Sequence, residues 1–313
     1  MKKIVFLDEY SIAGRNFEKV TSQGEYIAYD FTRKEQVVER LKDADIAITN
    51  KVVIDGEAMR QLPNLKLICI AATGMNNVDL ETAKELGIEV KNAVGYSTTS
   101  VAETTIASAL ALARNVVYFD EYFHDKRYSQ AERAFCYDRL TFQISGKRWG
   151  IIGLGNIGRE VARLASAFGC EVRYYSTSGV KRQEAYEAME LKELLEWCDI
   201  LSVHSPLNDQ TRGLVGAEEL SIMKPSAIVI NVARGGIIDE AALAEALDNG
   251  SIAAAALDVF SVEPLRESPL YNIKDRYRLL ASPHNAWSAA EAIDNLIDCI
   301  ANNISQWLEK NCD

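Results

Sequence analysis

Short apolar runs without alternation recur through the first hundred residues. Residues 3–7, 45–49 and 66–72 are almost entirely apolar, and charged stretches that are compatible with helices separate them. A strand that is apolar on both faces is typical of a parallel sheet that is covered by helices. The pattern therefore predicts one small parallel sheet within residues 1–95.

The next segment is one long apolar stretch. Residues 98–117 are rich in Ala and Leu and contain neither Gly nor Pro, which predicts a buried helix of about five turns. Residues 118–147 mix charges and aromatic side chains without a clean period. We expect a connecting segment there, and the sequence does not indicate its role.

A second and more regular series of strands follows this connector. The candidate strands are residues 148–152, 171–175, 199–203, 226–232, 253–259 and 277–282. Helix-compatible segments lie between them, so we expect a doubly wound parallel sheet. In the C-terminal tail, Ile293, Leu296 and Ile300 begin an apolar stripe at helical spacing, which predicts an amphipathic helix that packs on the first domain.

Length, charge and cysteine content narrow the class of protein. With 313 residues, two domains are expected at about 150 residues each. The net charge of −11 disfavours binding to nucleic acid. No run of about 18 apolar residues indicates a membrane span, and the acidic Asp8 and Glu9 interrupt any signal peptide. The six cysteines have no metal-binding spacing, so we expect a cytoplasmic protein without a metal.

A glycine-rich loop gives the strongest local motif. Gly153, Gly155 and Gly158 follow the predicted strand 148–152 and precede a helix-compatible segment. In this context the spacing lets the backbone approach a pyrophosphate at the N-terminus of a helix. We therefore predict a dinucleotide site that includes the whole loop: Gly153, Gly155, Asn156, Ile157 and Gly158.

The type of dinucleotide is less clearly indicated. A site for NAD usually has an Asp or Glu about 20 residues after the loop, to bind the ribose hydroxyls. Ser176 occupies that place here, and no carboxylate follows before Glu184. A set of hydroxyl and basic side chains could accommodate a 2′-phosphate instead: Ser176, Thr177, Ser178, Lys181 and Arg182. The cofactor is thus expected to be NAD or NADP, with NADP favoured.

Three residues after predicted strands are candidates for catalysis. The carboxyl ends of parallel strands meet at one edge of the sheet, and Arg234, Glu263 and His284 each follow a strand. An imidazole there can move a proton, and a guanidinium can bind a carboxylate. A histidine after a strand is also often structural. For His204, which also follows a strand, we first expect a structural role in packing.

The chain resembles the family of D-isomer-specific 2-hydroxyacid dehydrogenases along nearly its full length. The segments that resemble the family's signatures, in the family's order, are residues 146–162, 198–215, 223–243, 255–265 and 282–292. Residues 71–88 and 95–103 are most similar to those of glycerate dehydrogenases, which are also called hydroxypyruvate reductases.

The resemblance implies an α/β fold of two Rossmann-like or flavodoxin-like domains, with the active site in the cleft between them. It implies a discontinuous substrate-binding domain, residues 1–97 plus 286–313, and a dinucleotide-binding domain, residues 98–285. His284 would be the proton donor, with Glu263 bound to it and Arg234 on the substrate. The backbone at Thr73, Gly74 and Met75 would bind the substrate carboxylate. Further residues at the cofactor would be His204, Pro206, Val232, Ala233, Arg234, Asp258 and His284.

The activity implied is reduction of hydroxypyruvate or glyoxylate with NADH or NADPH. Another acid, such as D-lactate or phosphoglycerate, is an alternative substrate, although residues 73–77 offer no Lys or Arg for a phosphate. A dinucleotide-sensing protein that resembles the family's corepressors is a more distant alternative. The resemblance also implies a homodimer, with residues 98–117 and the aromatic connector as the contact region.

Overall fold

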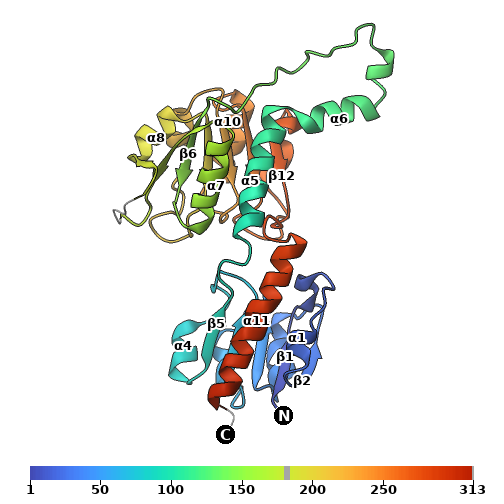
Figure 1. Ribbon diagram of the computed structural model, residues 1–313, viewed down its shortest axis with the longest axis vertical. Coiled ribbons are helices and arrows are strands. Elements are labelled where there is room, and N and C mark those ends of the chain that lie inside the picture. Colours follow the sequence, from blue (N-terminus) through green and yellow to red (C-terminus); the bar gives the residue numbers. More distant parts are fainter. Residues whose placement is uncertain (180–183, 312–313) are drawn as a thin grey trace. The chain divides into compact units, whose positions relative to one another are not determined.

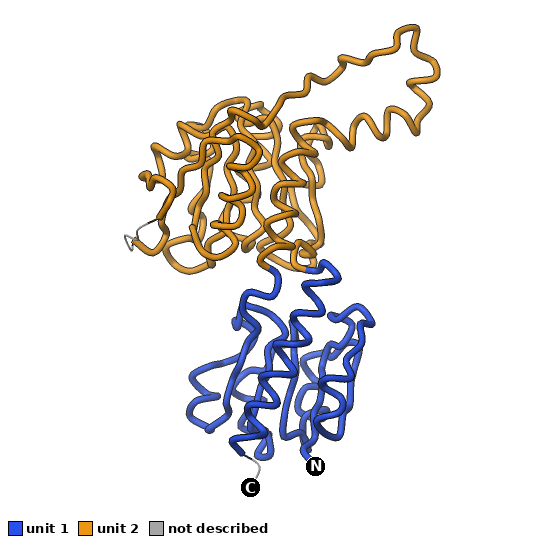
Figure 2. The backbone as a smooth tube through the Cα atoms, in the orientation of Figure 1, with its two compact units in different colours: residues 1–97, 288–313 blue, residues 98–287 orange. Residues whose placement is uncertain are grey.

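The computed structural model describes residues 1–179 and 184–311 of the chain (Figure 1). The chain forms two compact units, one of residues 1–97 with 288–313 and one of residues 98–287 (Figure 2). We call them unit 1 and unit 2. Each unit is built on a parallel sheet with helices, which confirms the predicted α/β class.

Unit 1 contains a parallel sheet with the strand order β2-β1-β3-β4-β5. Its described strands are β1 (Lys3–Phe6), β2 (Glu25–Ala28), β3 (Ile46–Thr49), β4 (Leu67–Ile70) and β5 (Glu89–Asn92). The apolar pattern predicts β1, β3 and β4 but misses β2 and β5. The two missed strands are the edges of the sheet, where partial exposure admits polar side chains and hides the apolar pattern.

Short helices connect these strands, and one long helix covers the sheet. The short elements are η1 (Glu9–Ile12), α1 (Glu18–Thr21), η2 (Lys34–Gln36), α2 (Val37–Leu41), α3 (Gly56–Arg60) and α4 (Leu80–Glu85). The long helix is α11 (Ala290–Asn311), which packs against α1 and β4 (Figure 1). Its apolar stripe is buried at Ile293, Leu296, Ile297, Ile300 and Ile304.

Unit 2 contains a larger parallel sheet with the strand order β12-β11-β10-β9-β6-β7-β8. Its described strands are β6 (Arg148–Ile152), β7 (Glu171–Tyr175), β8 (Glu187–Ala188), β9 (Ile200–Val203), β10 (Ile228–Asn231), β11 (Ala254–Leu257) and β12 (Leu279–Ala281). The chain reverses its direction across the sheet between β6 and β9. In doubly wound sheets, such a reversal opens a crevice at the carboxyl ends of the strands.

Helices cover both faces of this sheet. They are α5 (Thr98–Ala113), α6 (Val116–His124), α7 (Asn156–Ala167), α8 (Leu191–Trp197), α9 (Ala217–Ser221) and α10 (Glu240–Asn249), with η3 (Tyr128–Gln130), η4 (Pro269–Asn272) and η5 (Arg276–Arg278). Strand residues alternate between two cores: Ile151 packs with α5 and α7, whereas Ile152 packs with α8 and α10. The double coverage explains why these strands are apolar on both faces.

The helix predicted over residues 98–117 is shorter than expected. It ends at Ala113, because Asn115 adopts a left-handed conformation with φ of 49°, which asparagine tolerates better than most residues. A second helix, α6, then begins at Val116 and continues into the predicted connector. In Figure 1, α6 and the chain that follows it extend away from the rest of unit 2.

Among the helices in the described ranges, none is long and apolar enough to cross a lipid bilayer.

Candidate active site

The glycine loop lies between β6 and α7, and its three glycines differ in the space around them. Gly153 has φ of 90°, and a Cβ there would lie 2.9 Å from the backbone nitrogen of Ser205. A Cβ on Gly158 would lie 2.3 Å from the carbonyl oxygen of Gly153. Around Gly155, which precedes the first residue of α7, a Cβ would meet nothing within 4 Å. The tight contacts close the turn, and the open side at Gly155 leaves space for a phosphate.

A cavity of about 220 Å³ opens beside this loop. Most of its lining comes from the carboxyl ends of β6, β7 and β9, and Glu184 adds to it from the segment before β8. The lining residues at the strand ends are Gly153, Leu154, Gly155, Tyr174, Ser176, Thr177, Ser178, His204, Ser205 and Pro206. Predicted cofactor residues from three separate segments therefore share one cavity. Asn156 and Ile157 begin α7 directly after the loop. Lys181 and Arg182 lie outside the described residues.

A buried hydrogen-bond chain orients His204 in this cavity. The indole nitrogen of Trp149 donates to Oγ of Ser202 at 2.9 Å, and that hydroxyl lies 3.0 Å from Nε2 of His204. The indole can only donate, so Ser202 accepts from Trp149 and keeps its own proton available for Nε2 of His204. Burial lowers the pKa of His204 to about 3. The imidazole is therefore neutral at physiological pH.

Two buried polar atoms in the cavity wall lack a partner. Within residues 1–179 and 184–311, neither Nδ1 of His204 nor Oγ of Ser205 has a hydrogen-bond partner in the protein. Leaving a buried polar atom unpaired costs about 1–3 kcal/mol. A polar ligand in the cavity can supply the missing partner, so the residues present fit a dinucleotide.

His284 and Glu263 form a direct pair at the carboxyl ends of β12 and β11. Nδ1 of His284 lies 2.7 Å from Oε2 of Glu263, while Oε1 accepts the backbone N–H of Phe260 at 3.0 Å. Because Nδ1 faces the carboxylate, Nε2 is the ring nitrogen that can exchange a proton with a substrate. His284 also has φ of 57°, a conformation that costs a non-glycine residue energy and is common at functional sites.

Asp258 holds the loop that carries His284. Its Oδ1 accepts the hydroxyl of Ser282 at 2.6 Å and the N–H of Asn285 at 3.0 Å, and its Oδ2 accepts the N–H of Ala286 at 2.9 Å. Burial raises the pKa of Asp258 above its ordinary value, against the opposing effect of these hydrogen bonds. Three of about four acceptor positions on this carboxylate are thus used by the loop that carries His284.

Arg234 follows β10, the neighbour of β11 in the sheet. Its guanidinium donates to the carbonyl oxygen of Ala233 at 2.6 Å. The side-chain amide of Asn231 donates to the carbonyl oxygen of Arg234 at 2.9 Å and accepts the N–H of Ala233 at 3.1 Å. Next to Arg234, a Cβ on Gly235 would lie 1.9 Å from the backbone of Phe260. The Arg234 loop therefore packs directly on the loop that holds Glu263.

The expected substrate loop belongs to unit 1 and follows β4. The Thr73 hydroxyl donates to the carbonyl oxygen of Ala93 at 3.0 Å, and the Asn92 amide donates to the carbonyl oxygen of Thr73 at 2.7 Å. Gly74 and Met75 follow, with the carbonyl oxygen of Met75 accepting the N–H of Val78 at 3.1 Å. These bonds fix the loop from its own unit.

The buried cysteines and His124 are less suited to catalysis than His284. Burial raises the pKa of Cys69 and of Cys198 to about 12, so neither forms a thiolate readily. His124 is exposed on α6. The described residues hold no cluster of His, Cys, Asp or Glu that could bind a metal ion.

The sequence gives no sign of two parts of the site. The hydrogen-bond chain that reaches His204 begins at Trp149, which lies 55 positions away and appears in the sequence only as an apolar strand residue. Glu184 lies too far along the chain to be assigned to the cavity by spacing. In the structure its carboxylate lines the cavity and pairs with Arg159. Neither relationship leaves a local sequence signal.

A glycine loop at a strand-to-helix turn and a histidine–carboxylate pair at the same sheet edge define a dinucleotide-dependent oxidoreductase. The family model of the "D-isomer specific 2-hydroxyacid dehydrogenase, NAD binding domain" matches residues 106–286. This chain belongs to the family of D-isomer-specific 2-hydroxyacid dehydrogenases, NAD(P)-dependent enzymes, as its sequence predicted.

Relatives match along nearly the whole chain. A glycerate dehydrogenase of Methylorubrum extorquens is 37% identical over 309 residues, which cover 98% of this chain and 96% of the relative. A hydroxypyruvate reductase of Blautia hydrogenotrophica is 35% identical over 315 residues, covering 98% and 97%. The crystal structure of an NADPH-dependent glyoxylate/hydroxypyruvate reductase of Sinorhizobium meliloti with NADP and malonate has a TM-score of 0.84 and 27% identity, covering 98% and 93%.

Proposed function

We propose that this protein reduces hydroxypyruvate or glyoxylate to D-glycerate or glycolate, with NADH or NADPH as the reductant. The observation that carries the proposal is the 2.7 Å pair of His284 and Glu263, next to the loop of Arg234 in the unit that contains the glycine loop. The names of the relatives support the choice of substrate, since they include a glycerate dehydrogenase and a hydroxypyruvate reductase.

His284 is the proton donor in this proposal. A dinucleotide held by the glycine loop would supply the hydride that the carbonyl carbon of the oxoacid accepts. Negative charge then develops on the carbonyl oxygen, and an imidazolium that donates from Nε2 stabilises and protonates that oxygen. Glu263 accepts from Nδ1, which fixes the orientation of the ring and leaves Nε2 toward the substrate.

Arg234 binds the substrate carboxylate. A planar guanidinium forms two parallel hydrogen bonds to a carboxylate, and this orients the neighbouring carbonyl. The close packing of Gly235 on Phe260 holds Arg234 beside the loop of Glu263. We further propose that the backbone at Thr73, Gly74 and Met75 binds the same substrate. Because no Lys or Arg lies within residues 73–77, the proposal disfavours phosphorylated substrates.

Steady-state kinetics test the proposal. We expect kcat/KM to be highest for hydroxypyruvate and glyoxylate and lower for pyruvate and phosphohydroxypyruvate, measured at 340 nm with each reduced dinucleotide. The variant His284→Asn tests the proton donor, since asparagine tolerates the left-handed backbone at this position. It should lower kcat by at least about 10²-fold and leave dinucleotide binding intact.

Two results would overturn this proposal. One is oxidation of the dinucleotide that is no faster with any of these oxoacids than without them, which would leave the dinucleotide-sensing alternative. The other is a His284→Asn variant with the kcat of the wild type.

We also propose a homodimer formed through α5, α6 and the chain that follows. A hollow of about 920 Å³ lies between α6 and residues 134–141. Several large apolar side chains around it are exposed, including Phe123, Phe135, Tyr137 and Leu140 at 63%, 75%, 78% and 82%. Exposed apolar groups gathered on one segment are typical of an interface.

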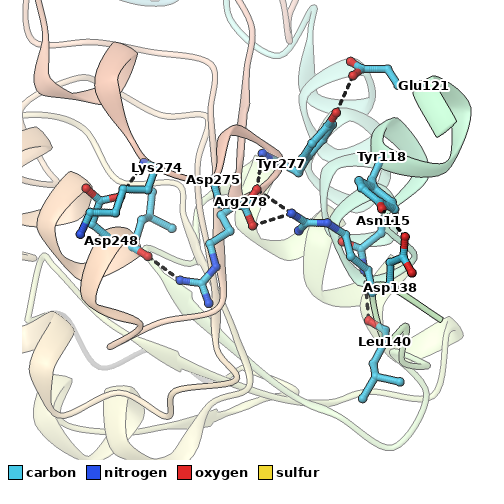
Figure 3. Close-up of polar contacts among 12 residues, drawn as sticks. Asn115, Tyr118, Glu121, Asp138, Leu140, Asp248, Lys274, Asp275, Tyr277 and Arg278 are labelled. Carbon is cyan, nitrogen blue, oxygen red and sulfur yellow. Dashed lines mark hydrogen bonds and ion pairs between the residues drawn. The ribbon is translucent and has the colours of Figure 1, made fainter. Parts of the chain in front are cut away.

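Polar contacts anchor this segment to the rest of unit 2 (Figure 3). Tyr277 donates to Glu121 on α6 at 2.7 Å, and within the segment itself Tyr118 donates to Asp138 at 2.9 Å. Arg139 bonds both oxygens of Asp275 at 2.5 and 2.6 Å. The base of the segment is therefore fixed, which suits a surface that binds a second copy of the chain.

Sedimentation velocity at micromolar concentration tests the dimer. We expect a dimer for the wild type and a monomer for the double variant Phe135→Asp, Leu140→Asp. Tyr10→Asp is the matched control, because Tyr10 is 81% exposed in unit 1, and it should remain dimeric. A monomeric wild type would contradict the proposal.

We place this activity in the cytoplasm. The five described cysteines are free thiols, which suits a reducing compartment. Cysteine alkylation without prior reduction, on protein isolated from the native cell, would show disulfides if this placement were wrong.

A further inference from the structure

We infer that Asp8 is a positioning residue for the loop that follows β4, residues 71–77, and that it acts through the turn at residues 50–52. The inference rests on the proposed function, in which the backbone at residues 73–75 binds the oxoacid, so we call residues 71–77 the substrate loop. It adds to the reaction a residue that the sequence presents only as a polar position after an apolar run.

The carboxylate of Asp8 is buried just beyond the carboxyl end of β1. Asp8 is 8% exposed. Its Oδ1 accepts the N–H of Asn50 at 2.8 Å, and its Oδ2 accepts the N–H groups of Lys51 and Val52 at 2.7 and 3.3 Å. Burial raises the pKa of Asp8, against the opposing effect of these three bonds. Because a buried carboxylate is unfavourable without such partners, the three bonds tie the conformation of the turn to Asp8.

Three side-chain hydrogen bonds join this turn to the substrate loop. The Asn50 amide donates to the carbonyl oxygen of Ala71 at 2.9 Å. The Asn77 amide donates to the carbonyl oxygens of Asn50 and Val52 at 3.4 and 3.1 Å. Ala71 and Asn77 are the two ends of the substrate loop. The turn that Asp8 holds therefore fixes the loop on both sides of residues 73–75.

Asp45 offers a comparison within the same unit. It directly precedes β3, and its carboxylate accepts the N–H of Lys3 at 2.9 Å and pairs with Lys2 at 2.8 Å. Because β1 and β3 are parallel, Asp8 lies at the carboxyl edge of the sheet and Asp45 at the amino edge. The substrate loop follows β4 and shares the edge of Asp8. Loss of either carboxylate should weaken unit 1, but only loss of Asp8 should disturb the substrate loop.

Steady-state kinetics of Asp8→Asn with hydroxypyruvate and glyoxylate test the inference. The amide nitrogen cannot accept, so at least one N–H of the turn loses its partner. We expect kcat/KM to fall between about tenfold and 10²-fold. Most of this fall should be a higher KM, because the loop binds a carboxylate that is the same in the ground state and the transition state. The Kd of NADH should stay within about twofold of the wild type, since the glycine loop belongs to unit 2.

Asp45→Asn is the matched control. Both variants should lower the melting temperature, because each removes a carboxylate from its hydrogen bonds, but Asp45→Asn should keep KM within about twofold of the wild type. A purely structural role of Asp8 would make the two variants alike, with lower stability and an unchanged KM. That result overturns the inference, as does a lower kcat with an unchanged KM in Asp8→Asn.

Asn77→Ala tests the same connection without removing a buried charge, and it decides the question if Asp8→Asn does not fold. It removes the bonds to residues 50 and 52 and should raise KM about fivefold, the ratio that one ordinary hydrogen bond supplies. In the double variant, KM should rise by less than the product of the two single effects, because both act on one turn. An unchanged KM in Asn77→Ala overturns the inference, and so does a full product in the double variant.

Hydrogen–deuterium exchange without substrate separates the inference from the proposed function. Peptides that cover residues 71–77 should exchange about fivefold faster in Asp8→Asn than in the wild type, the effect of one lost hydrogen bond on local opening. Asp45→Asn should leave their exchange unchanged. A wild type that turns over neither oxoacid contradicts the proposed function, and exchange alone then decides the inference. Equal exchange of these peptides in the wild type and Asp8→Asn overturns it.

Discussion

The carboxylate of Asp258 accepts the hydroxyl of Ser282 at 2.6 Å, two residues before His284. The same carboxylate accepts the N–H groups of Asn285 and Ala286. Asp258 therefore bonds the loop both before and after the histidine. Asp258 is 2% exposed. The left-handed backbone at His284 is thus held by a buried acceptor from the neighbouring strand, β11.

Asp258→Asn tests this support. The amide nitrogen cannot accept, so at least one N–H of the loop loses its partner. We expect the free energy of unfolding to fall by about 1–3 kcal/mol and kcat to fall more than the affinity for the dinucleotide. Urea unfolding and steady-state kinetics measure the two effects. Ser282→Ala removes one bond only and should have a smaller effect on both, and the opposite order would contradict this role.

Glu263→Gln tests the charge next to His284. The amide can keep the bond to Phe260 through its oxygen, but its nitrogen then faces Nδ1 of His284 and cannot accept the ring proton, and the negative charge beside the ring is lost. We expect kcat to fall between about tenfold and 10²-fold. The Kd of the dinucleotide should stay within about twofold of the wild type, which is the usual effect of a substitution outside the binding contacts. Equal kcat values for variant and wild type would remove Glu263 from the proposed mechanism.

Two glycines of the loop should respond differently to alanine. Gly155→Ala places its methyl in open space with φ of −81°, so the fold should be unchanged while dinucleotide affinity falls. Gly158→Ala drives a Cβ to 2.3 Å from the carbonyl oxygen of Gly153, so stability should fall together with affinity. Thermal unfolding without ligand separates the two cases. Equal melting temperatures would show that the contact at Gly158 relaxes freely.

His204 makes the fold sensitive to acid. Its pKa is about 3 in the folded protein, against an ordinary value of 6.5, so the unfolded chain binds a proton that the folded chain does not. The free energy of unfolding should therefore decrease as pH falls from 6.5 toward 3, by about 1.4 kcal/mol per pH unit from this group. Urea unfolding at several pH values measures the slope.

His204→Gln provides the comparison. Its amide oxygen can accept from Ser202 in place of Nε2, and it does not titrate. Its stability should fall less steeply with acid than that of the wild type over the same range. Parallel curves for the two proteins would show that His204 ionises normally in the folded state.

The sequence by itself determined the class of fold and the kind of chemistry. Strands buried on both faces must be apolar without alternation, and the contact of Gly158 with Gly153 lies within one strand-turn-helix unit. His284, Glu263 and Arg234 are identifiable as candidates because each follows a strand, and parallel strands bring their carboxyl ends to one edge. Each of these features depends on neighbouring residues or on the order of the strands, so a single sequence is enough to predict it.

Only the tertiary structure decided which distant groups meet. The edge strands β2 and β5 are set by pairing with β1 and β4, not by their own apolar content. The pair of Arg159 and Glu184 and the chain from Trp149 to His204 each join residues that are dozens of positions apart. Such contacts depend on strand register and on how helices pack on the sheet. Those arrangements result from many weak interactions summed over the whole fold, and they leave no pattern in any one segment.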